Sequence, residues 1–160
     1  MPNPFAKSRW YHKLSNIFVA PGFRLLPMPR GFVLLTVTGR RTGLTRRRPV
    51  RAVRRDNTFY AVAVLGERSD WLRNVRANPT MGLKVGGRTH EGQAREVADA
   101  GEREEAGRLY AEQVFPYDYI DYPTVHWAWP GRRAIVKAHR QWLRNGVLVA
   151  IDLTGDGDEA

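Results

Sequence analysis

Residues 32–57 read FVLLTVTGRRTGLTRRRPVRAVRRDN, and this stretch decides the fold that we expect. Phe32 to Thr38 is a short apolar run rich in β-branched residues, which predicts a buried strand. Gly39 to Gly43 carries a glycine at each end and predicts a tight turn. Arg46 to Arg55 predicts a second strand that ends at an Asp-Asn turn. Two strands joined by so short a turn are expected to pair antiparallel.

The rest of the chain adds further strands and helices to this hairpin. The predicted strands are Phe59 to Leu65, Met81 to Val85, Thr89 to Val97 and Val147 to Leu153. The predicted helices are Asn3 to Phe18, Ser69 to Asn78, Glu102 to Val114 and Ala134 to Arg144. Strands and helices do not alternate regularly, which disfavours a Rossmann topology. The pattern predicts an α+β, mainly β protein, built on a small barrel of about six mostly antiparallel strands.

A chain of 160 residues suffices for one domain with its own core, and no repeat or low-complexity tract suggests a second domain. We therefore expect a single domain over residues 1–160. Within it, residues 1–30 form an N-terminal helix and loop, and residues 155–160 form a flexible tail. The chain contains no cysteine, which excludes disulfides, thiolate zinc sites and cysteine nucleophiles.

The apolar segments of the chain indicate where in the cell we expect the protein. No apolar stretch follows a charged start, and the longest apolar run, Phe32 to Val37, is too short to span a bilayer. We therefore expect a cytoplasmic protein. One face of the first helix is apolar beside basic residues, and it consists of Trp10, Leu14, Ile17 and Phe18. We favour packing of this face on the barrel, and the alternative is a peripheral membrane contact through residues 4–18.

The formal net charge is +10, and eight arginines fall between Arg40 and Arg55. A basic surface attracts nucleic acid, acidic lipid, or a phosphorylated or polycarboxylate ligand, and charge alone does not choose among them. A basic nucleic-acid-binding module is one interpretation, because arginines with nearby aromatics can follow a phosphate backbone. Strand alternation sends these arginines to both faces of the sheet, so we expect no nucleic acid as partner.

The Gly39–Gly43 turn is the first of three segments that suit a ligand. Exposed amides of such a turn, with guanidinium groups beside them, can hold a phosphate. Arg46 and Arg48 share a face of the following strand, since side chains alternate with period two. Taken alone, the segment fits a charged hairpin turn better than a binding site.

The second segment is Gly66 to Asn74, GERSDWLRN, where a glycine turn precedes a helix N-terminus that can receive an anion. Trp71 and Asn74 are three residues apart and lie on one face of that helix. Taken alone, the segment is better explained by Ser69 capping the helix and Trp71 packing.

The third segment, Phe115 to Trp129, is dense in aromatic residues and broken by prolines, so we do not expect a regular core element there. It suits the wall of a pocket for a flat ligand, or equally a loop packed on the barrel mouth. Its rings are Tyr117, Tyr119, Tyr122, His126, Trp127 and Trp129. The four histidines of the chain lie far apart in sequence, and we expect no metal site.

Together these segments resemble the deazaflavin-dependent nitroreductase family of actinobacteria, whose members adopt a split β-barrel and bind coenzyme F-420. The resemblance covers Phe32 to Tyr122 and keeps the order and spacing of three motifs. The matching residues are Leu34 to Gly43, Arg46, Arg48, Pro49, Trp71, Asn74, Arg76 to Pro79, Tyr119 and Tyr122. This chain departs from the family at Arg41, where many members carry lysine, at Arg48, where many carry asparagine, and at Phe115, which replaces an expected tyrosine.

The resemblance implies a cofactor site for coenzyme F-420, an 8-hydroxy-5-deazaflavin with a phospholactyl and polyglutamate tail. By this resemblance, the phosphate and tail would be served by Arg40, Arg41, Thr42, Gly43 and Arg46. The ring would be lined by Arg48, Pro49, Ala63, Val64 and Leu65. Trp71 and Asn74 would flank the tail, and Gly66 and Arg68 complete the predicted set.

The resemblance also implies hydride transfer from the reduced deazaflavin to small activated acceptors, namely nitroaromatics, quinones or enones. Tyr119 or Tyr122 would bind the acceptor oxygen or deliver a proton, because a phenol with a pKa near 10 is an acid at neutral pH. Water is the alternative proton donor. Other interpretations are a reductase that binds flavin mononucleotide (FMN) on the same barrel and a deazaflavin carrier without turnover. The sequence leaves monomer or dimer open.

Overall fold

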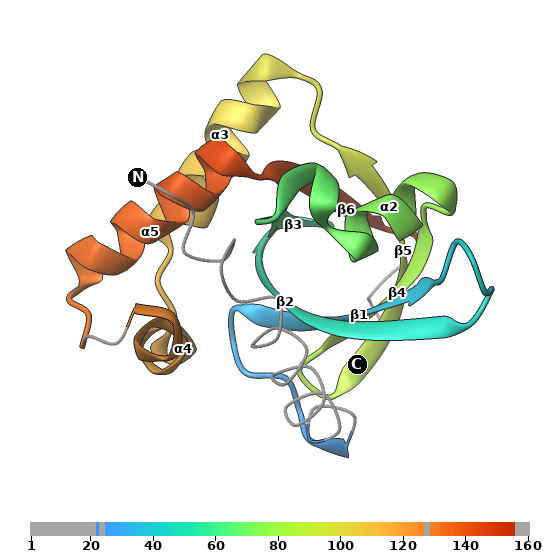
Figure 1. Ribbon diagram of the computed structural model, residues 1–160, viewed down its shortest axis with the longest axis horizontal. Helices are drawn as coiled ribbons and strands as arrows, with labels where there is room; N and C mark the ends of the chain where they lie inside the picture. Colours follow the sequence, from blue (N-terminus) through green and yellow to red (C-terminus); the bar gives the residue numbers. More distant parts are fainter. Residues whose placement is uncertain (1–21, 23–24, 127–128, 156–160) are drawn as a thin grey trace.

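Six strands close into one antiparallel barrel in the order β1-β2-β3-β6-β5-β4. The computed structural model in Figure 1 describes residue 22, residues 25–126 and residues 129–155. The predicted small antiparallel barrel is therefore confirmed. Its strands are β1 (Phe32–Thr38), β2 (Thr45–Arg55), β3 (Thr58–Ala63), β4 (Thr80–Val85), β5 (Arg88–Glu96) and β6 (Val147–Leu153).

The first two strands pair as an antiparallel hairpin, as the sequence predicts. β1 and β2 pair along their length, from Phe32 opposite Arg51 to Thr38 opposite Thr45. The third strand was predicted to reach Leu65 but ends at Ala63, because the chain then enters the 3-10 turn η2 (Gly66–Arg68). Val64 and Leu65, predicted as part of that strand, are therefore a connection between β3 and η2.

The barrel interior is an apolar core that one short helix completes. Alternate residues of β1, Val33, Leu35 and Val37, face inward with buried residues from the other strands. Helix α2 (Asp70–Ala77) adds Trp71 and Leu72 to the same cluster. The sequence places Ser69 as the cap of this helix, and Ser69 is at the N-cap position, although its side chain makes no capping hydrogen bond.

A second core covers the outer face of β2, β3 and β6, where α3 (Ala100–Glu112) and α5 (Arg132–Asn145) pack. Figure 1 shows these two helices side by side on that flank of the barrel, with α4 (Pro116–His126) next to the start of α5. Tyr110 of α3 is fully buried there among strand residues such as Val53 and Leu148.

The aromatic segment was predicted to be irregular, and its first part is instead helix α4 (Pro116–His126). Pro116 starts the helix, where its missing N–H costs no intrahelical bond and its fixed φ suits the first turn. Asp118 accepts a hydrogen bond from the backbone N–H of Phe115 at 2.8 Å, which satisfies one of the free donors at the helix start. Pro123 is accommodated inside the helix.

Residues 1–21 lie outside the described residues, and so do the helix predicted for Asn3 to Phe18 and its apolar face. Most of the predicted tail, residues 156–160, lies outside them as well. Among the described residues, no helix is both long enough and apolar enough to cross a bilayer.

Candidate functional site

The turn between β1 and β2 is built as a compact glycine loop. The backbone N–H of Gly39 donates to Leu44 O at 2.8 Å, and that of Gly43 donates to Gly39 O at 2.8 Å. Gly43 has a φ of +68°, a left-handed conformation that glycine adopts without steric cost. The N–H of Leu44 donates to the hydroxyl of Thr42 at 3.3 Å. Three of the six amides from Gly39 to Leu44 thus hold the turn itself.

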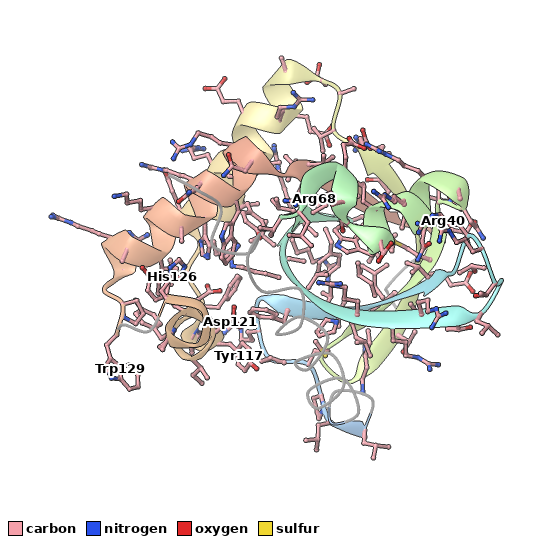
Figure 2. The ribbon with its side chains drawn as sticks, viewed as in Figure 1. Arg40, Arg68, Tyr117, Asp121, His126 and Trp129 are labelled. Carbon is pink, nitrogen blue, oxygen red and sulfur yellow. The ribbon has the colours of Figure 1, made fainter. Side chains whose placement is uncertain are left out.

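Arg40 joins this turn to helix α2, 34 residues further along the chain. Its backbone N–H donates to Asn74 Oδ1 at 3.2 Å, and its guanidinium donates to the same oxygen at 3.0 Å. The guanidinium also lies 3.4 Å from a carboxylate oxygen of Asp70. The first two predicted motifs therefore meet in space, at the corner where Figure 2 labels Arg40.

The corner, where the Gly39–Gly43 turn meets the start of α2, also has hydrogen-bond donors without a described acceptor. In the part of the chain that the structure describes, the backbone N–H groups of Arg41 and Thr42 have no acceptor. The side chains of Arg41 and Arg46 are exposed beside them. Two free amides and two guanidinium groups form a donor set that suits an anion such as phosphate.

Arg46 and Arg48 lie on the inner face of β2, as the sequence predicts. They stand opposite Val37 and Leu35, two residues of the barrel interior, and directly opposite residues share a face. Pro49 stands opposite Leu34 and therefore lies on the other face. The side chains of Arg48 and Pro49, both predicted to line the ring, therefore lie on opposite faces of β2, and their contact with the ring stays a prediction.

The part of β2 that holds Arg48 is not paired with β3. Pairing between β2 and β3 runs only from Arg55 opposite Thr58 to Ala52 opposite Ala61, although β2 continues to Thr45. If this register continued, Arg48 would stand opposite Leu65. Instead β3 ends at Ala63 and the chain turns away through η2.

Arg48 is half-buried and has no hydrogen bond or ion pair with any residue that the structure describes. Burial lowers the pKa of its guanidinium, and the charge of Asp70 opposes this shift. Asp70 is already in contact with Arg40.

Trp71 and Asn74 are both buried, although the sequence predicts that they contact the cofactor. Trp71 is 5% exposed and packs in the barrel core. Asn74 is buried, and its side-chain oxygen accepts the two bonds from Arg40. Contact of either residue with a cofactor stays a prediction, whereas their structural roles are observed. Gly66 is buried at the start of η2, and Arg68 at its end is exposed.

The two predicted catalytic tyrosines both lie on α4 but in different surroundings. Tyr119 is 37% exposed beside Ile120, which is 62% exposed. Tyr122 is half-buried, stacks on the ring of His126 at 4.1 Å, and lines a small cavity between α4 and α5. Tyr119 is therefore the more accessible phenol.

The tyrosine helix and the glycine turn lie at opposite ends of β1. Tyr117 of α4 contacts Phe32 edge to face at 4.9 Å, and Phe32 begins the strand that ends at the turn. At about 3.3 Å per residue, the length of β1 separates the two groups by about 20 Å. In Figure 2, the labels of Tyr117 and Arg40 lie on opposite sides of the barrel.

The sequence analysis missed a buried ionic cluster beneath α4. Arg51, 6% exposed, donates through Nε to Asp118 Oδ1 at 2.9 Å and through Nη1 to Tyr110 O at 2.9 Å. A further guanidinium N–H donates to Gln113 O. One side chain thus caps the carbonyl end of α3 and holds the start of α4. The sequence signal available was Asp118 three residues after Phe115, in the capping-box spacing.

Two ionisable groups beside this cluster have shifted pKa values. Burial raises the pKa of Asp121 to about 6, and the negative charge of Asp118 adds to the shift. Burial and the charge of Arg51 lower the pKa of His139 to about 4, so His139 is neutral at pH 7. Its Nδ1–H donates to Ala111 O at 3.2 Å.

The predicted cofactor residues do not line a groove of about 570 Å³ that the described residues form. This groove runs over the outer face of β1, β4 and β5, between residues such as Thr36, Gly82 and His90. Among the described residues there is no group of three His, Asp or Glu side chains placed to hold a metal ion.

A family model and one solved structure, compared with this chain, name the same cofactor. A family model described as F420H(2)-dependent quinone reductase matches residues 7–125. A solved structure of an F420-H2 dependent reductase (FDR-A) is 25% identical, with a TM-score of 0.53 over 79% of this chain and 97% of that chain. Another, described as a domain-swapped dimer, is 21% identical, with a TM-score of 0.55 over 91% of this chain and 98% of that chain. The second comparison supports the fold alone.

Proposed function

The chain belongs to the F420H(2)-dependent quinone reductase family, and from this premise we propose that it reduces small activated acceptors such as quinones, nitroaromatics or enones. It is an oxidoreductase, and its cofactor is coenzyme F-420. When bound, the reduced deazaflavin supplies the hydride, and the protein supplies binding, orientation and any proton.

The observation that carries the proposal is the Arg40–Asn74 contact, which brings the glycine turn and the start of α2 to one corner. There, Arg41, Arg46 and the free amides of Arg41 and Thr42 suit the phosphate and the acidic tail. Arg40 contacts Asn74 and Asp70 and so holds the turn against α2. Its contact with the phosphate or the tail stays a prediction.

The length of the barrel also suits this ligand. A tail bound at the glycine turn leaves about 20 Å of β1 toward the end where α4 lies. An extended cofactor with a flat ring at one end fits that distance better than a compact ligand does. We place the ring between Arg48 and residues 63–65, and the acceptor on the α4 side.

We assign the acceptor-facing role to Tyr119 before Tyr122. A donor to the acceptor oxygen must be reachable, and Tyr119 is the more exposed phenol, whereas Tyr122 stacks on His126. A hydrogen bond from Tyr119 would stabilise negative charge developing on the acceptor oxygen. Water remains the alternative proton donor.

A fluorescence titration with oxidised coenzyme F-420 tests cofactor choice. We expect binding at micromolar or lower concentration, and weaker binding of flavin mononucleotide, because an acidic tail adds contacts with the basic corner. Steady-state assays with a quinone, a nitroarene and an enone then identify the acceptor. Tight binding of flavin mononucleotide without any binding of coenzyme F-420 contradicts the proposal.

The nucleic-acid interpretation loses support from the contacts of the arginines. Arg51 is buried in the ionic cluster, Arg54 donates to Asp56 O at 2.7 Å, and Arg55 pairs with Glu105. The arginines of β2 therefore do not form one continuous track.

A single domain over residues 1–160 and a cytoplasmic location stay predictions. The oligomeric state and membrane contact through residues 4–18 are left to sedimentation with and without vesicles.

A further inference from the structure

The outer face of β1, β4 and β5 holds the groove of about 570 Å³ that the predicted cofactor residues do not line. Every residue of its lining belongs to a strand, from β1, β2, β4 or β5. Figure 1 shows α3, α4 and α5 gathered on the other flank of the barrel. Among the described residues, the groove is therefore a sheet surface to which no helix contributes.

One row of residues crosses this face and has opposite charges at its two ends. The register places Arg47 of β2 opposite Thr36, Thr36 opposite Gly82, and Gly82 opposite Glu91 of β5. All four residues line the groove. Residues directly opposite each other share a face, and strands lie about 4.8 Å apart, so the two charges stand about 14 Å apart along the row. The middle of the row is low because Gly82 has no side chain.

Neither charge of this row is used within the described part of the chain. The side chains of Arg47 and Glu91 are exposed, and neither makes a hydrogen bond or ion pair with a described residue. By contrast, Arg95, on the same strand as Glu91, pairs with Asp152 at 2.7 Å. The row therefore presents an available cation and an available anion on opposite sides of a hollow.

The row is complementary to itself when its order is reversed. A rotation of 180° about an axis that runs along the strands, between β1 and β4, brings a second copy face to face with the first. Arg47 then faces Glu91 of the partner subunit, and Thr36 faces the hollow at Gly82 of the partner subunit. The same contacts recur on the other side of the axis, which is the property of a two-fold interface, where one patch meets itself.

We propose that the outer face of β1, β4 and β5 is a two-fold interface between two copies of this chain, in which Arg47 of each copy pairs with Glu91 of the other. The presence of both signs of charge favours a second copy over a lipid or nucleic-acid surface. Those surfaces are anionic and would repel Glu91. The inference goes beyond the proposed function, because none of the four residues of the row belongs to the predicted cofactor set.

The size of the face predicts a weak dimer. Two sheets packed with nearly aligned strands lie about 10 Å apart, a distance that an arginine and a glutamate can span together. Four strands and three rows cover roughly 20 Å by 20 Å, so the two copies together bury about 800 Å². This area is at the low end for a specific interface. We therefore expect association only at micromolar or higher concentration.

The test is sedimentation velocity of the full chain from about 5 to about 500 µM, with two charge reversals. Arg47→Glu gives the row two anions, and Glu91→Arg gives it two cations. Each variant alone should associate at least about tenfold more weakly than the wild type, because like charges then face each other. A 1:1 mixture of the two variants should associate about as well as the wild type, because an anionic row then meets a cationic one.

The matched control is Arg133→Glu, the same charge reversal at an exposed position on α5. It should change the association constant by less than about threefold. Melting temperatures of all variants confirm that they are folded. The chain has no cysteine, so Thr36→Cys adds a single thiol to the face. Its reaction with a maleimide should become slower as the protein concentration rises.

Four outcomes overturn the proposal. A monomer at every concentration whose introduced thiol reacts freely leaves the face without a partner. A monomer whose thiol is protected shows that another segment of the same chain covers the face. A dimer that persists in both single variants has its interface elsewhere. A mixture that associates no better than the single variants shows that the two charges do not pair across a two-fold axis.

Discussion

The two halves of strand β2 place their partly or fully buried arginines, Arg48 and Arg51, in different surroundings. In the half from Thr45 to Pro49, Arg46 is exposed, and Arg48 is half-buried with no hydrogen bond or ion pair to a described residue. In the half from Val50 to Arg55, Arg51 is buried and bonded to Asp118 and to two main-chain carbonyls. The side chain of Arg51 also lies over the ring of Tyr110 at 4.5 Å.

The difference comes from what packs against each half. The second half has α3 and α4 over its outer face, so Arg51 meets the carbonyl end of one helix and the first turn of another. The first half pairs with β1 alone, because β3 has already turned away. Local sequence is similarly basic in both halves, and tertiary neighbours decide whether an arginine is structural or available to a ligand.

The largest effect expected from this comparison is on stability. Arg51→Ala leaves Asp118 buried without its cation and should lower the free energy of unfolding by about 3–5 kcal/mol. Arg54→Ala, an exposed position on the same strand, should change it by less than about 1 kcal/mol. Urea unfolding followed by tryptophan fluorescence measures both. Equal small changes would show that the buried cluster does not hold α3 and α4 to the barrel.

The strands of the barrel were predictable because the sequence signals for a strand are local. Phe32 to Thr38 and Val147 to Leu153 are apolar and β-branched, and the structure has them as β1 and β6 with the same bounds. The Arg51 cluster was not predictable, because it joins residues 67 positions apart in sequence. Pro116 and Pro123 suggested an irregular segment, whereas a proline in the first turn is compatible with a helix.

The site was predictable only in part, for a related reason. Three motifs indicated which segments matter, but not that Arg40 would bond to Asn74 rather than remain free. The one-residue alternation of a strand sends Pro49 to the face opposite Arg48, which the resemblance alone did not distinguish.

The next effect is on turnover, at the end of the barrel where α4 lies. If Tyr119 donates to the acceptor oxygen, Tyr119→Phe should lower kcat by about 10²–10³ while leaving cofactor affinity unchanged. Tyr122→Phe should lower it less, because Tyr122 is stacked on His126. Steady-state reduction of a quinone and a nitroarene measures both variants. Wild-type rates for both on both acceptors would assign the proton to solvent.

A smaller effect is expected on cofactor affinity, in the first half of β2. Arg41→Ala and Arg46→Ala should each weaken binding of coenzyme F-420 by about 1.5–3 kcal/mol, the cost of one charge-assisted contact with a phosphate. Arg55→Ala is the control, since Arg55 pairs with Glu105 at the far end of the strand. Fluorescence titration at two salt concentrations gives the affinities. Equal small losses in all three variants would indicate a diffuse positive field.

The smallest effect concerns the charge balance of the buried cluster. The pKa of Asp121 is raised to about 6 from an ordinary 3.8, so its contribution to stability is present below pH 3.8 and lost as the pH rises through 6. Asp121→Asn removes that loss and should stabilise the protein by about 1–2 kcal/mol at pH 8, with no gain at pH 3.5. His139, with a pKa lowered to about 4, destabilises the fold as the pH falls from 6.5 to 4. This happens in the wild type and in Asp121→Asn alike, so its effect cancels in the difference between the two proteins.

Asp118→Asn is the matched control, and it should destabilise at pH 8 because Arg51 loses its counter-charge. Urea unfolding at pH 3.5, 6 and 8 separates the two carboxylates. If Asp121→Asn destabilises at pH 8 as Asp118→Asn does, then Asp121 belongs to the ion pair rather than opposing it.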